Sequence, residues 1–348
     1  MNDAVSLIPD TPIFGHEVFT EALAQSLASG RIAHGWLLTG PSGIGKSIMA
    51  CMAAAWMLSE RRPEKSGFSL DTADPGANLV IGGAHPDMML VRPQVEDNKS
   101  GQIKIDQIRK VSSFMATKPG RGGWRIVIID SMDVVNRNGA NALLKLLEEP
   151  PERAMLMLIS SRPGQLPPTI RSRCRLVRAT ALAHHECQQV LSRMLVDETQ
   201  PRIDTLATLG EGAPGRAAAL AASGADDMYK ALCALLAEPR LDETALAELC
   251  DKWGRGGAAG QAGRDGAIWL IGRLLRLAAR HAVMPDTDGL CEFETPAVER
   301  LILVRSASDL AKAYTDFIDA AGRMESLYMD FGLFLSRQLG GLLRKSLP

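Results

Sequence analysis

The part of this chain that most constrains its fold is a glycine-rich segment between an apolar strand and a helix. Residues 36–39 (WLLT) are apolar enough for a buried strand, and the next eight residues read GPSGIGKS. This segment meets every position of the phosphate-binding pattern G-x-x-x-x-G-K-[ST]. Its glycines allow successive backbone N–H groups to turn toward one anion. We therefore predict a phosphate-binding loop made of Gly40, Pro41, Ser42, Gly43, Ile44, Gly45, Lys46 and Ser47.

The last two residues of this loop carry the chemistry that the pattern predicts. Lys46 is expected to reach the β- and γ-phosphates of a nucleotide, and the Ser47 hydroxyl is expected to ligate Mg²⁺. A helix predicted over residues 48–60 points its positive N-terminal end at the same phosphates. The alternative is a glycine-rich turn that only joins a strand to a helix. Because no position of the pattern is mismatched, we favour binding of ATP or ADP with Mg²⁺.

A second acidic position follows the apolar run at residues 125–130, which reads RIVIID. Continuous apolar runs of this length are typical of buried parallel strands. The C-terminal ends of such strands are where an open α/β sheet places its ligands. Asp130 is therefore predicted to act with Lys46 and Ser47 as the Mg²⁺-associated carboxylate. An aspartate that only caps the following turn would give the same pattern.

The residue after Asp130 is Ser131, whereas most hydrolysing members of this class have an acid there that polarises the attacking water. A hydroxyl cannot accept a proton at neutral pH as a carboxylate does. Loss of a general base costs on the order of 10²–10⁴ in rate. Asp133 lies three positions further along and is expected to fall short of the water. We therefore predict nucleotide binding with weak or absent hydrolysis by the chain itself.

Two serines follow the next predicted strand, at residues 155–159. Ser160 and Ser161 are delivered to the same C-terminal edge of the sheet. A hydroxyl at this place is able to sense the γ-phosphate, but an ordinary serine at the end of a strand explains the sequence equally well.

The order of the predicted elements separates two kinds of architecture along the chain. Residues 35–178 alternate strand and helix, which predicts a parallel sheet covered on both faces. After residue 182 no strand pattern persists, and apolar residues recur at helical spacing. The stretches 61–85 and 254–265 are rich in glycine and polar residues and are predicted to be loops.

Composition excludes several classes of protein. The net charge is −1, so the chain lacks the basic character of a nucleic-acid-binding domain, and DNA contact is expected only through partners. No apolar run is long enough to cross a membrane, and the first residues do not form a signal peptide, so we expect a cytoplasmic location. The six cysteines lack any C-x-x-C pair. They predict reduced, buried thiols and no zinc site.

Two further motifs identify a family. NALLKLLEEPPE occupies residues 141–152 and TIRSRCR occupies residues 169–175. Together with the phosphate loop and Asp130, in this order, they make the chain similar to the clamp-loader branch of the AAA+ ATPases. Within that branch it resembles the δ′ subunits of bacterial DNA polymerase III. The resemblance covers residues 12–178 strongly and the helical remainder only by general layout.

The resemblance implies a three-part fold and a place in an assembly. It implies an AAA+ P-loop NTPase domain with a parallel α/β sheet over residues 1–180. A small helical lid domain over 181–225 and an all-α collar domain over 226–348 are expected to follow. The implied partners are the other clamp-loader subunits, both motor and delta, and the sliding clamp and primed DNA through the complex. An ATP-hydrolysing motor subunit, or another AAA+ remodelling ATPase, is the alternative.

The resemblance also assigns roles to particular residues. Arg173 matches the arginine of the S-R-C motif, which acts as an arginine finger on ATP bound to the adjacent subunit. From the residues alone, an ordinary surface arginine is the favoured interpretation. Arg216 lies near the place of a second sensing arginine in the lid, but Gly215 occupies the matching position, so its role stays open. The family's four-cysteine zinc module has no counterpart, because residues 61–85 contain no cysteine.

Overall fold

The computed structural model divides the chain into two compact units, Met1–Leu182 and Ala183–Pro348. The structure describes residues 14–342 except 16, 31, 61–72, 95–100, 122, 255–257, 286–288 and 325–328. The first unit is built on a five-stranded sheet, and the described residues of the second unit are helical apart from turns and connections. This confirms the predicted parallel α/β region followed by an all-helical region.

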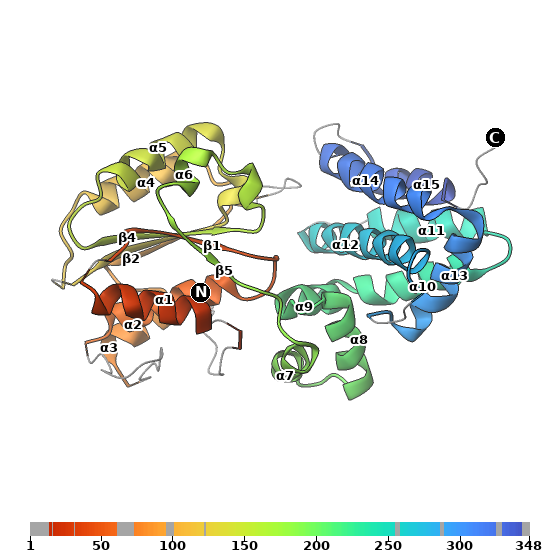
Figure 1. Ribbon diagram of the computed structural model, residues 1–348, viewed down its shortest axis with the longest axis horizontal. Helices are drawn as coiled ribbons and strands as arrows, with labels where there is room; N and C mark the ends of the chain where they lie inside the picture. The colour runs from red at the N-terminus through yellow and green to blue at the C-terminus, as the bar shows by residue number, and fades with distance from the viewer. Residues whose placement is uncertain are drawn as a thin grey trace. The chain divides into compact units, whose positions relative to one another are not determined.

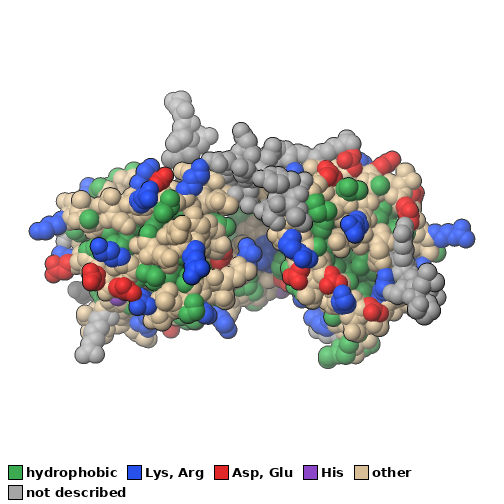
Figure 2. Space-filling view, turned by 90° about the horizontal axis from the view of Figure 1, so that it is seen from above, with side chains coloured by type: hydrophobic (Ala, Val, Ile, Leu, Met, Phe, Trp, Pro, Cys, Tyr) green, Lys and Arg blue, Asp and Glu red, His purple; other side chains and the backbone are tan. Residues whose placement is uncertain are grey.

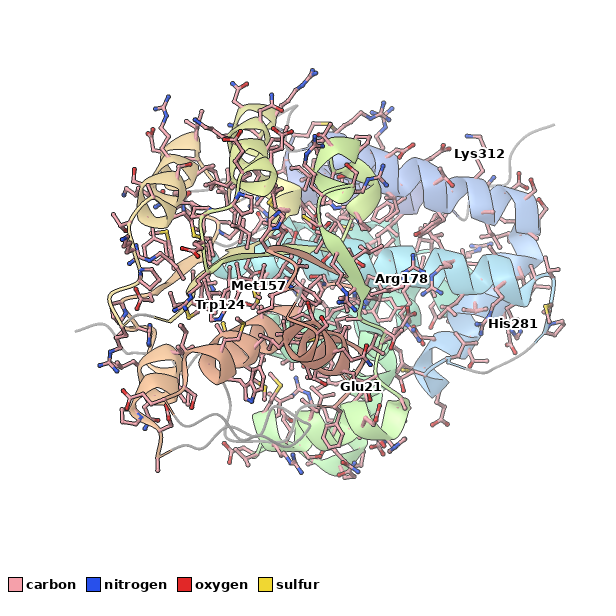
Figure 3. All side chains as sticks on the ribbon, turned by 60° about the vertical axis from the view of Figure 1, so that its left-hand side comes forward. Glu21, Trp124, Met157, Arg178, His281 and Lys312 are labelled. Carbon is pink, nitrogen blue, oxygen red and sulfur yellow. The ribbon has the colours of Figure 1, made fainter. Side chains whose placement is uncertain are left out.

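All strand pairs in the sheet are parallel, in the order β2-β3-β4-β1-β5. The strands are β1 (Gly35–Thr39), β2 (Met88–Val91), β3 (Arg125–Asp130), β4 (Ala154–Ser160) and β5 (Arg175–Arg178). Met157, labelled in Figure 3, lies in the central strand β4, opposite Trp36 of β1. The three inner strands are buried over nearly their whole length, as their apolar runs predict.

The register brings the C-terminal ends of the inner strands to one edge. Thr39 at the end of β1 lies opposite Ser160, the last residue of β4. Asp130 at the end of β3 lies opposite Ile159. The phosphate loop, Asp130 and the strand-end serines therefore meet at this edge, which we call the C-terminal edge of the sheet.

Helices cover both faces of the sheet: α4, α5 and α6 lie on one face, and α1, α2 and α3 on the other (Figure 1). Their bounds are α1 (Glu17–Ala28), α2 (Lys46–Leu58), α3 (Pro75–Ile81), α4 (Ile105–Met115), α5 (Arg137–Glu148) and α6 (Pro168–Arg171). Two short 3₁₀ turns, η1 (Met132–Val134) and η2 (Pro163–Gln165), follow β3 and β4. Helix α2 is buried on nearly every face, as its apolar sequence predicts.

Two local expectations in this unit are wrong. The stretch 61–85 was expected to be a loop, but it contains α3 within its described part. The Asp74 carboxylate caps this helix by accepting from the Ala77 N–H, and a proline occupies the first helical position. The sequence also predicts a helix over residues 139–149 with Asn138 as its cap, but α5 begins at Arg137. Its cap is Asn136, which accepts from the Gly139 N–H at 2.8 Å, and not Asn138.

The second unit is an array of α-helices. Its helices are α7 (His184–Met194), α8 (Gln200–Gly210), α9 (Pro214–Ser223), α10 (Ala225–Ala237), α11 (Glu243–Gly254), α12 (Ala258–His281), α13 (Thr295–Val304), α14 (Ala307–Met324) and α15 (Phe331–Gly340), with a 3₁₀ turn η3 (Glu292–Glu294) before α13. None of the helices in the described part of the chain is both long and apolar enough to span a membrane.

The glycine-rich stretch 254–265, predicted to be a loop, is helical from Ala258 onward. A close helix contact follows directly after this stretch. A Cβ on Gly266 would lie 2.8 Å from the Cβ of Ala225, so α12 approaches α10 as closely as a helix without side chains allows. Tertiary contact of this kind overrides the weak helix propensity of glycine.

A buried ion-pair cluster joins four segments of the second unit. Arg273 of α12 donates to both oxygens of Glu294 at 3.0 Å and to Glu211, in the turn between α8 and α9, at 2.6 Å. The Tyr229 hydroxyl donates to Glu294 at 2.7 Å. The cluster spans both the predicted lid (181–225) and the predicted collar (226–348). That division remains a prediction.

Candidate functional site

The phosphate loop has the backbone that its glycines predict. Gly40, Gly43 and Gly45 have φ values of 141°, 82° and 93°, which residues with a Cβ rarely adopt. At Gly40 a Cβ would also lie 2.3 Å from the carbonyl oxygen of Ala179. The loop therefore requires glycine for its conformation and for its approach to the chain that follows β5.

Lys46 is 5% exposed and lies over the beginning of the loop. Its ammonium donates to the carbonyl oxygens of Gly40 at 2.8 Å and Pro41 at 2.6 Å, and to the Ser161 hydroxyl at 3.1 Å. Two of these contacts fix the ammonium to the loop itself. The third joins it to the end of β4, so the C-terminal edge holds a buried positive charge in a defined place.

Ser47 and Asp130 supply oxygen atoms at the same edge of the sheet. The Ser47 hydroxyl lies in the first turn of α2, is buried, and has no hydrogen-bond partner among the described residues. A buried polar atom without a partner costs about 1–3 kcal/mol, so its retention needs an explanation. Asp130 ends β3, against which α2 packs. A hydroxyl and a carboxylate are the hard oxygen ligands that Mg²⁺ prefers, so these residues fit the predicted metal.

Asp133, in η1, has a carboxylate that is fully engaged with the end of β4. One oxygen accepts from the Ser160 hydroxyl at 2.5 Å and from the Arg162 N–H at 3.3 Å. The other accepts from the Ser161 N–H at 2.7 Å and from the Ser131 hydroxyl at 3.2 Å. Sequence reasoning missed this function. From the sequence alone, Asp133 is interpreted only as a candidate general base.

The structure distinguishes the two serines that the sequence left equivalent. Ser160 is completely buried, and its hydroxyl is used by Asp133 and by the Arg162 N–H. The Ser161 hydroxyl faces Lys46 instead. Only Ser161 thus presents its side chain to the phosphate loop.

Arg173 lies at the opposite edge of the sheet. A Cβ on Gly35, the first residue of β1, would lie 3.2 Å from the Arg173 carbonyl oxygen, whereas the phosphate loop follows the last residue of β1. A five-residue strand spans roughly 13–16 Å, more than one arginine side chain can reach. The guanidinium is 36% exposed, pairs with Glu148 at 2.7 Å, and donates to the Thr169 carbonyl at 3.1 Å.

We call this opposite edge, where the strands begin, the N-terminal edge of the sheet. It contains a buried ion pair that the sequence did not indicate. Asp87 precedes β2, and its carboxylate accepts from Arg125 of β3 at 3.0 Å and from the Gly120 N–H at 2.8 Å. The turn between α4 and β3 contacts this carboxylate through the N–H groups of Gly120 and Arg121. Burial alone would raise the pKa of Asp87, but the bonds from Gly120, Arg125 and the Arg121 N–H lower it below its usual value.

Arg216, whose role the sequence left open, makes its described contacts inside the second unit. Its guanidinium lies 3.5 Å from the centre of the Trp269 ring and donates to the Gly210 carbonyl at 3.0 Å. Burial lowers the pKa of Arg216 to about 10, so it stays charged at neutral pH.

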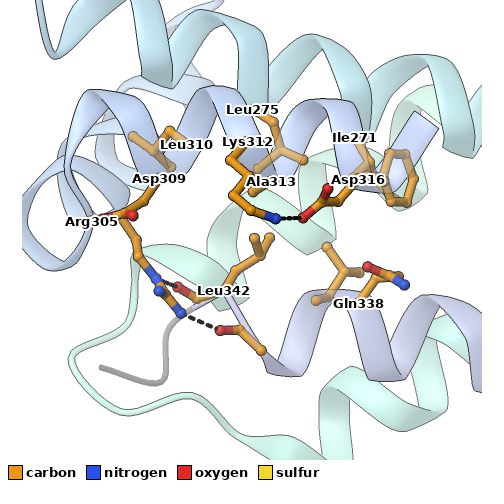
Figure 4. A pocket seen from close by; sticks show the side chains of 13 residues that line it. Ile271, Leu275, Arg305, Asp309, Leu310, Lys312, Ala313, Asp316, Gln338 and Leu342 are labelled. Atoms are coloured by element: carbon orange, nitrogen blue, oxygen red, sulfur yellow. Dashed lines mark hydrogen bonds and ion pairs between the residues drawn. The ribbon is translucent and has the colours of Figure 1, made fainter. Parts of the chain in front are cut away.

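The six cysteines and one cavity lie outside this site. All six cysteines are buried, as predicted, and burial raises the pKa of Cys51 and Cys174 to about 12. The described residues contain no group of three or more His, Cys, Asp and Glu side chains placed to hold a metal. A cavity of about 310 Å³ lies between α12, α14 and α15 (Figure 4). Its charged side chains contact protein groups: Lys312 pairs with Asp316, and Arg305 donates to the carbonyls of Gly341 and Leu342.

Comparison with known proteins shows which family the chain resembles. Residues 15–183 match the model of the family described as DNA polymerase III, delta subunit. The chain is 32% identical over 221 residues to DNA polymerase III subunit delta′ of Pseudomonas aeruginosa, which is 64% of this chain and 66% of that protein. It is 29% identical over 217 residues to subunit delta′ of Escherichia coli (62% and 63%). It is 30% identical over 206 residues to subunit tau of Escherichia coli (58% and 30%). The matched stretch thus spans 66% or less of the length of these relatives.

Proposed function

Through residues 15–183 the chain belongs to the DNA polymerase III, delta subunit family, and on this premise we propose that it is a δ′-like clamp-loader subunit. It binds ATP or ADP with Mg²⁺ at the phosphate loop. It also offers Arg173 to the nucleotide of a neighbouring ATPase subunit during loading of a sliding clamp in DNA replication. Its partners are the motor and delta subunits and, through the assembly, the clamp and primed DNA.

The observation that carries this proposal is the separation of Lys46 and Arg173 on opposite edges of one sheet. An arginine that cannot reach the phosphate loop of its own chain is of use only to a phosphate presented by another chain. An external guanidinium neutralises charge that develops on the transferred phosphoryl group, which is worth about 10³–10⁵ in rate. The guanidinium of Arg173 is partly exposed, so it is able to leave Glu148 and pair with a phosphate of a neighbouring subunit.

Weak turnover at the chain's own site is supported by its carboxylates. Ser131 follows Asp130, and Asp133 already accepts hydrogen bonds on both oxygens. An acid that holds the end of β4 is not free to take a proton from water. Binding groups are therefore retained, while the general base is missing, which costs on the order of 10²–10⁴ in rate.

Contact with DNA through partners is supported by the distribution of charge. Lys and Arg side chains are interspersed with Asp and Glu side chains on the face in Figure 2, and the net charge of the chain is −1. Phosphate backbones are bound by gathered positive charge. Tagged full-length chain is therefore expected to copurify with clamp-loader subunits from the cells that make it, and to bind primed DNA only in their presence.

Arg173→Ala tests the role of the arginine in the reconstituted assembly. ATP hydrolysis by the complex is expected to fall by on the order of 10³, because the charge on the phosphoryl group loses its external partner. Arg171→Ala, at an exposed arginine two residues away, is the matched control and is expected to leave hydrolysis near wild type. The nucleotide affinity of the isolated variant should not change. Unaltered hydrolysis by the Arg173→Ala complex would contradict the proposal.

A motor subunit is the second candidate, because the phosphate loop has no mismatched position and because the tau subunit is among the relatives. The two candidates differ in the turnover of the isolated chain. The motor predicts hydrolysis by the purified protein itself, and the δ′-like subunit predicts binding with almost none.

A further inference from the structure

Asp133 joins the residues that follow β3 to those that end β4, at the C-terminal edge of the sheet. It lies in η1, directly after β3, and its carboxylate accepts from two hydroxyls and two backbone N–H groups. Three of these four donors belong to residues 160–162, at the end of β4. The parallel ladder pairs β3 with β4 as far as Ile159, and Asp133 holds the three residues that follow.

The residue held by Asp133 is the one that contacts the lysine of the loop. The Ser161 N–H donates to Asp133 at 2.7 Å, and the Ser161 hydroxyl accepts from the Lys46 ammonium at 3.1 Å. Within the described part of the chain, the Ser161 hydroxyl donates to no acceptor. An unused O–H donor beside a buried ammonium is suited to an anionic oxygen, and Asp133 determines where that donor lies.

We propose that Asp133 is a positioning residue of the phosphate loop: it fixes Ser161 beside Lys46 so that the site distinguishes a nucleoside triphosphate from a diphosphate. The inference rests on the proposed nucleotide site and adds the residue that determines its selectivity. The γ-phosphate of a triphosphate accepts from both Lys46 and Ser161. A diphosphate lacks the oxygen that would lie between them.

An aspartate is required because four donors converge on it. Its two oxygens accept two hydrogen bonds each, whereas an asparagine has one oxygen and directs an NH₂ group toward donors. Asp133→Asn therefore leaves the Ser161 N–H or the Ser160 hydroxyl without an acceptor. The end of β4 then moves, and the Ser161 hydroxyl leaves its place beside Lys46.

The test measures dissociation constants of the full-length chain for a non-hydrolysable ATP analogue and for ADP, both with Mg²⁺. Asp133→Asn is expected to reduce the preference for the triphosphate by about 3- to 10-fold, the effect of one hydrogen bond, while ADP affinity changes less than about 2-fold. Ser161→Ala should reduce the preference by a similar factor. The double variant should lose no more than either single variant, because both substitutions remove the same contact.

Asp74→Ala is the matched control, since it removes another buried carboxylate of the same unit that accepts from a backbone N–H. Asp74 caps α3 and lies away from the loop, so this variant should keep the wild-type preference. Equal losses for the ATP analogue and ADP in Asp133→Asn, or an unchanged preference in Ser161→Ala, would overturn the role of Asp133. A wild-type chain that binds neither nucleotide would overturn the proposed function as well.

Discussion

The two edges of the sheet in the first unit differ in how their polar groups are satisfied. At the N-terminal edge, the Asp87 carboxylate is 1% exposed and is surrounded by the guanidinium of Arg125 and two backbone N–H groups. At the C-terminal edge, the Ser47 hydroxyl is buried without a partner in the described residues. The first edge uses its charges to hold the fold together, whereas the second has a buried hydroxyl without a partner, among the residues that the structure describes, where we propose the nucleotide site.

This difference shows why a buried polar residue alone does not identify a site. Asp87 and Lys46 are both buried and charged, but the contacts of Asp87 involve a turn and a strand that it holds in place. Lys46 contacts a glycine-rich loop and a strand-end hydroxyl. Substitution of Asp87 should therefore change stability, and substitution of Lys46 should change binding.

The largest effect is expected for Asp87→Asn. Breaking a buried ion pair leaves the Arg125 charge uncompensated and should lower the free energy of unfolding by about 3–5 kcal/mol. Denaturant titration of the full-length chain measures this change. The nucleotide affinity of the folded fraction should remain at the wild-type value. A stable variant that has lost nucleotide binding would contradict the separation of the two edges.

Lys46→Ala should produce the converse result. Removing the ammonium is expected to weaken nucleotide binding by about 2–5 kcal/mol, which is a factor of at least roughly 30 in the dissociation constant. The free energy of unfolding should change by about 1 kcal/mol or less, since the loss of hydrogen bonds to the loop and to Ser161 is offset by no longer burying an ammonium. Calorimetric titration and denaturant titration of the same preparation compare the two quantities. Unchanged affinity would show that the loop holds no phosphate.

Ser47→Ala is expected to have a smaller effect on nucleotide affinity, and it distinguishes a ligand-binding hydroxyl from a structural one. The variant loses a buried hydroxyl without a partner in the described chain, so its stability should stay the same or rise slightly. The Mg²⁺-dependent part of nucleotide affinity should fall by about 10-fold, the value of one ligand to the metal. Titrations with and without Mg²⁺ measure this part. Loss of stability with normal Mg²⁺ dependence would place the hydroxyl among the structural groups.

The smallest effect is the pH dependence of the N-terminal edge. The pKa of Asp87 is lower in the folded chain than its ordinary value, so its stabilising contribution is complete above about pH 4. It is lost as the pH falls through the lower, folded pKa. The difference in unfolding free energy between wild type and Asp87→Asn should therefore be constant near neutral pH and shrink below about pH 4. A difference that is unchanged at pH 3 would argue against the ion pair.

The sequence was sufficient for features that depend on local pattern. The phosphate loop, the buried strands and the placement of Asp130 at a strand end follow from spacing and apolar runs, and the structure contains them. The first turns of α12 could not be predicted, because their glycine-rich sequence has weak helix propensity. The same holds for Asp133 and Asp87, whose partners lie 28 and 38 residues away in the chain. A single sequence does not specify such long-range pairs.

We propose that this chain holds a nucleotide at the C-terminal edge of its sheet without cleaving it, and that it acts on a neighbouring subunit from the N-terminal edge. The most direct test is to measure binding and steady-state hydrolysis on one preparation of the isolated full-length chain. We expect the isolated chain to bind an ATP analogue with micromolar affinity and to hydrolyse ATP at a rate near background. Turnover of several per second by the isolated chain, lost in Lys46→Ala, would contradict it.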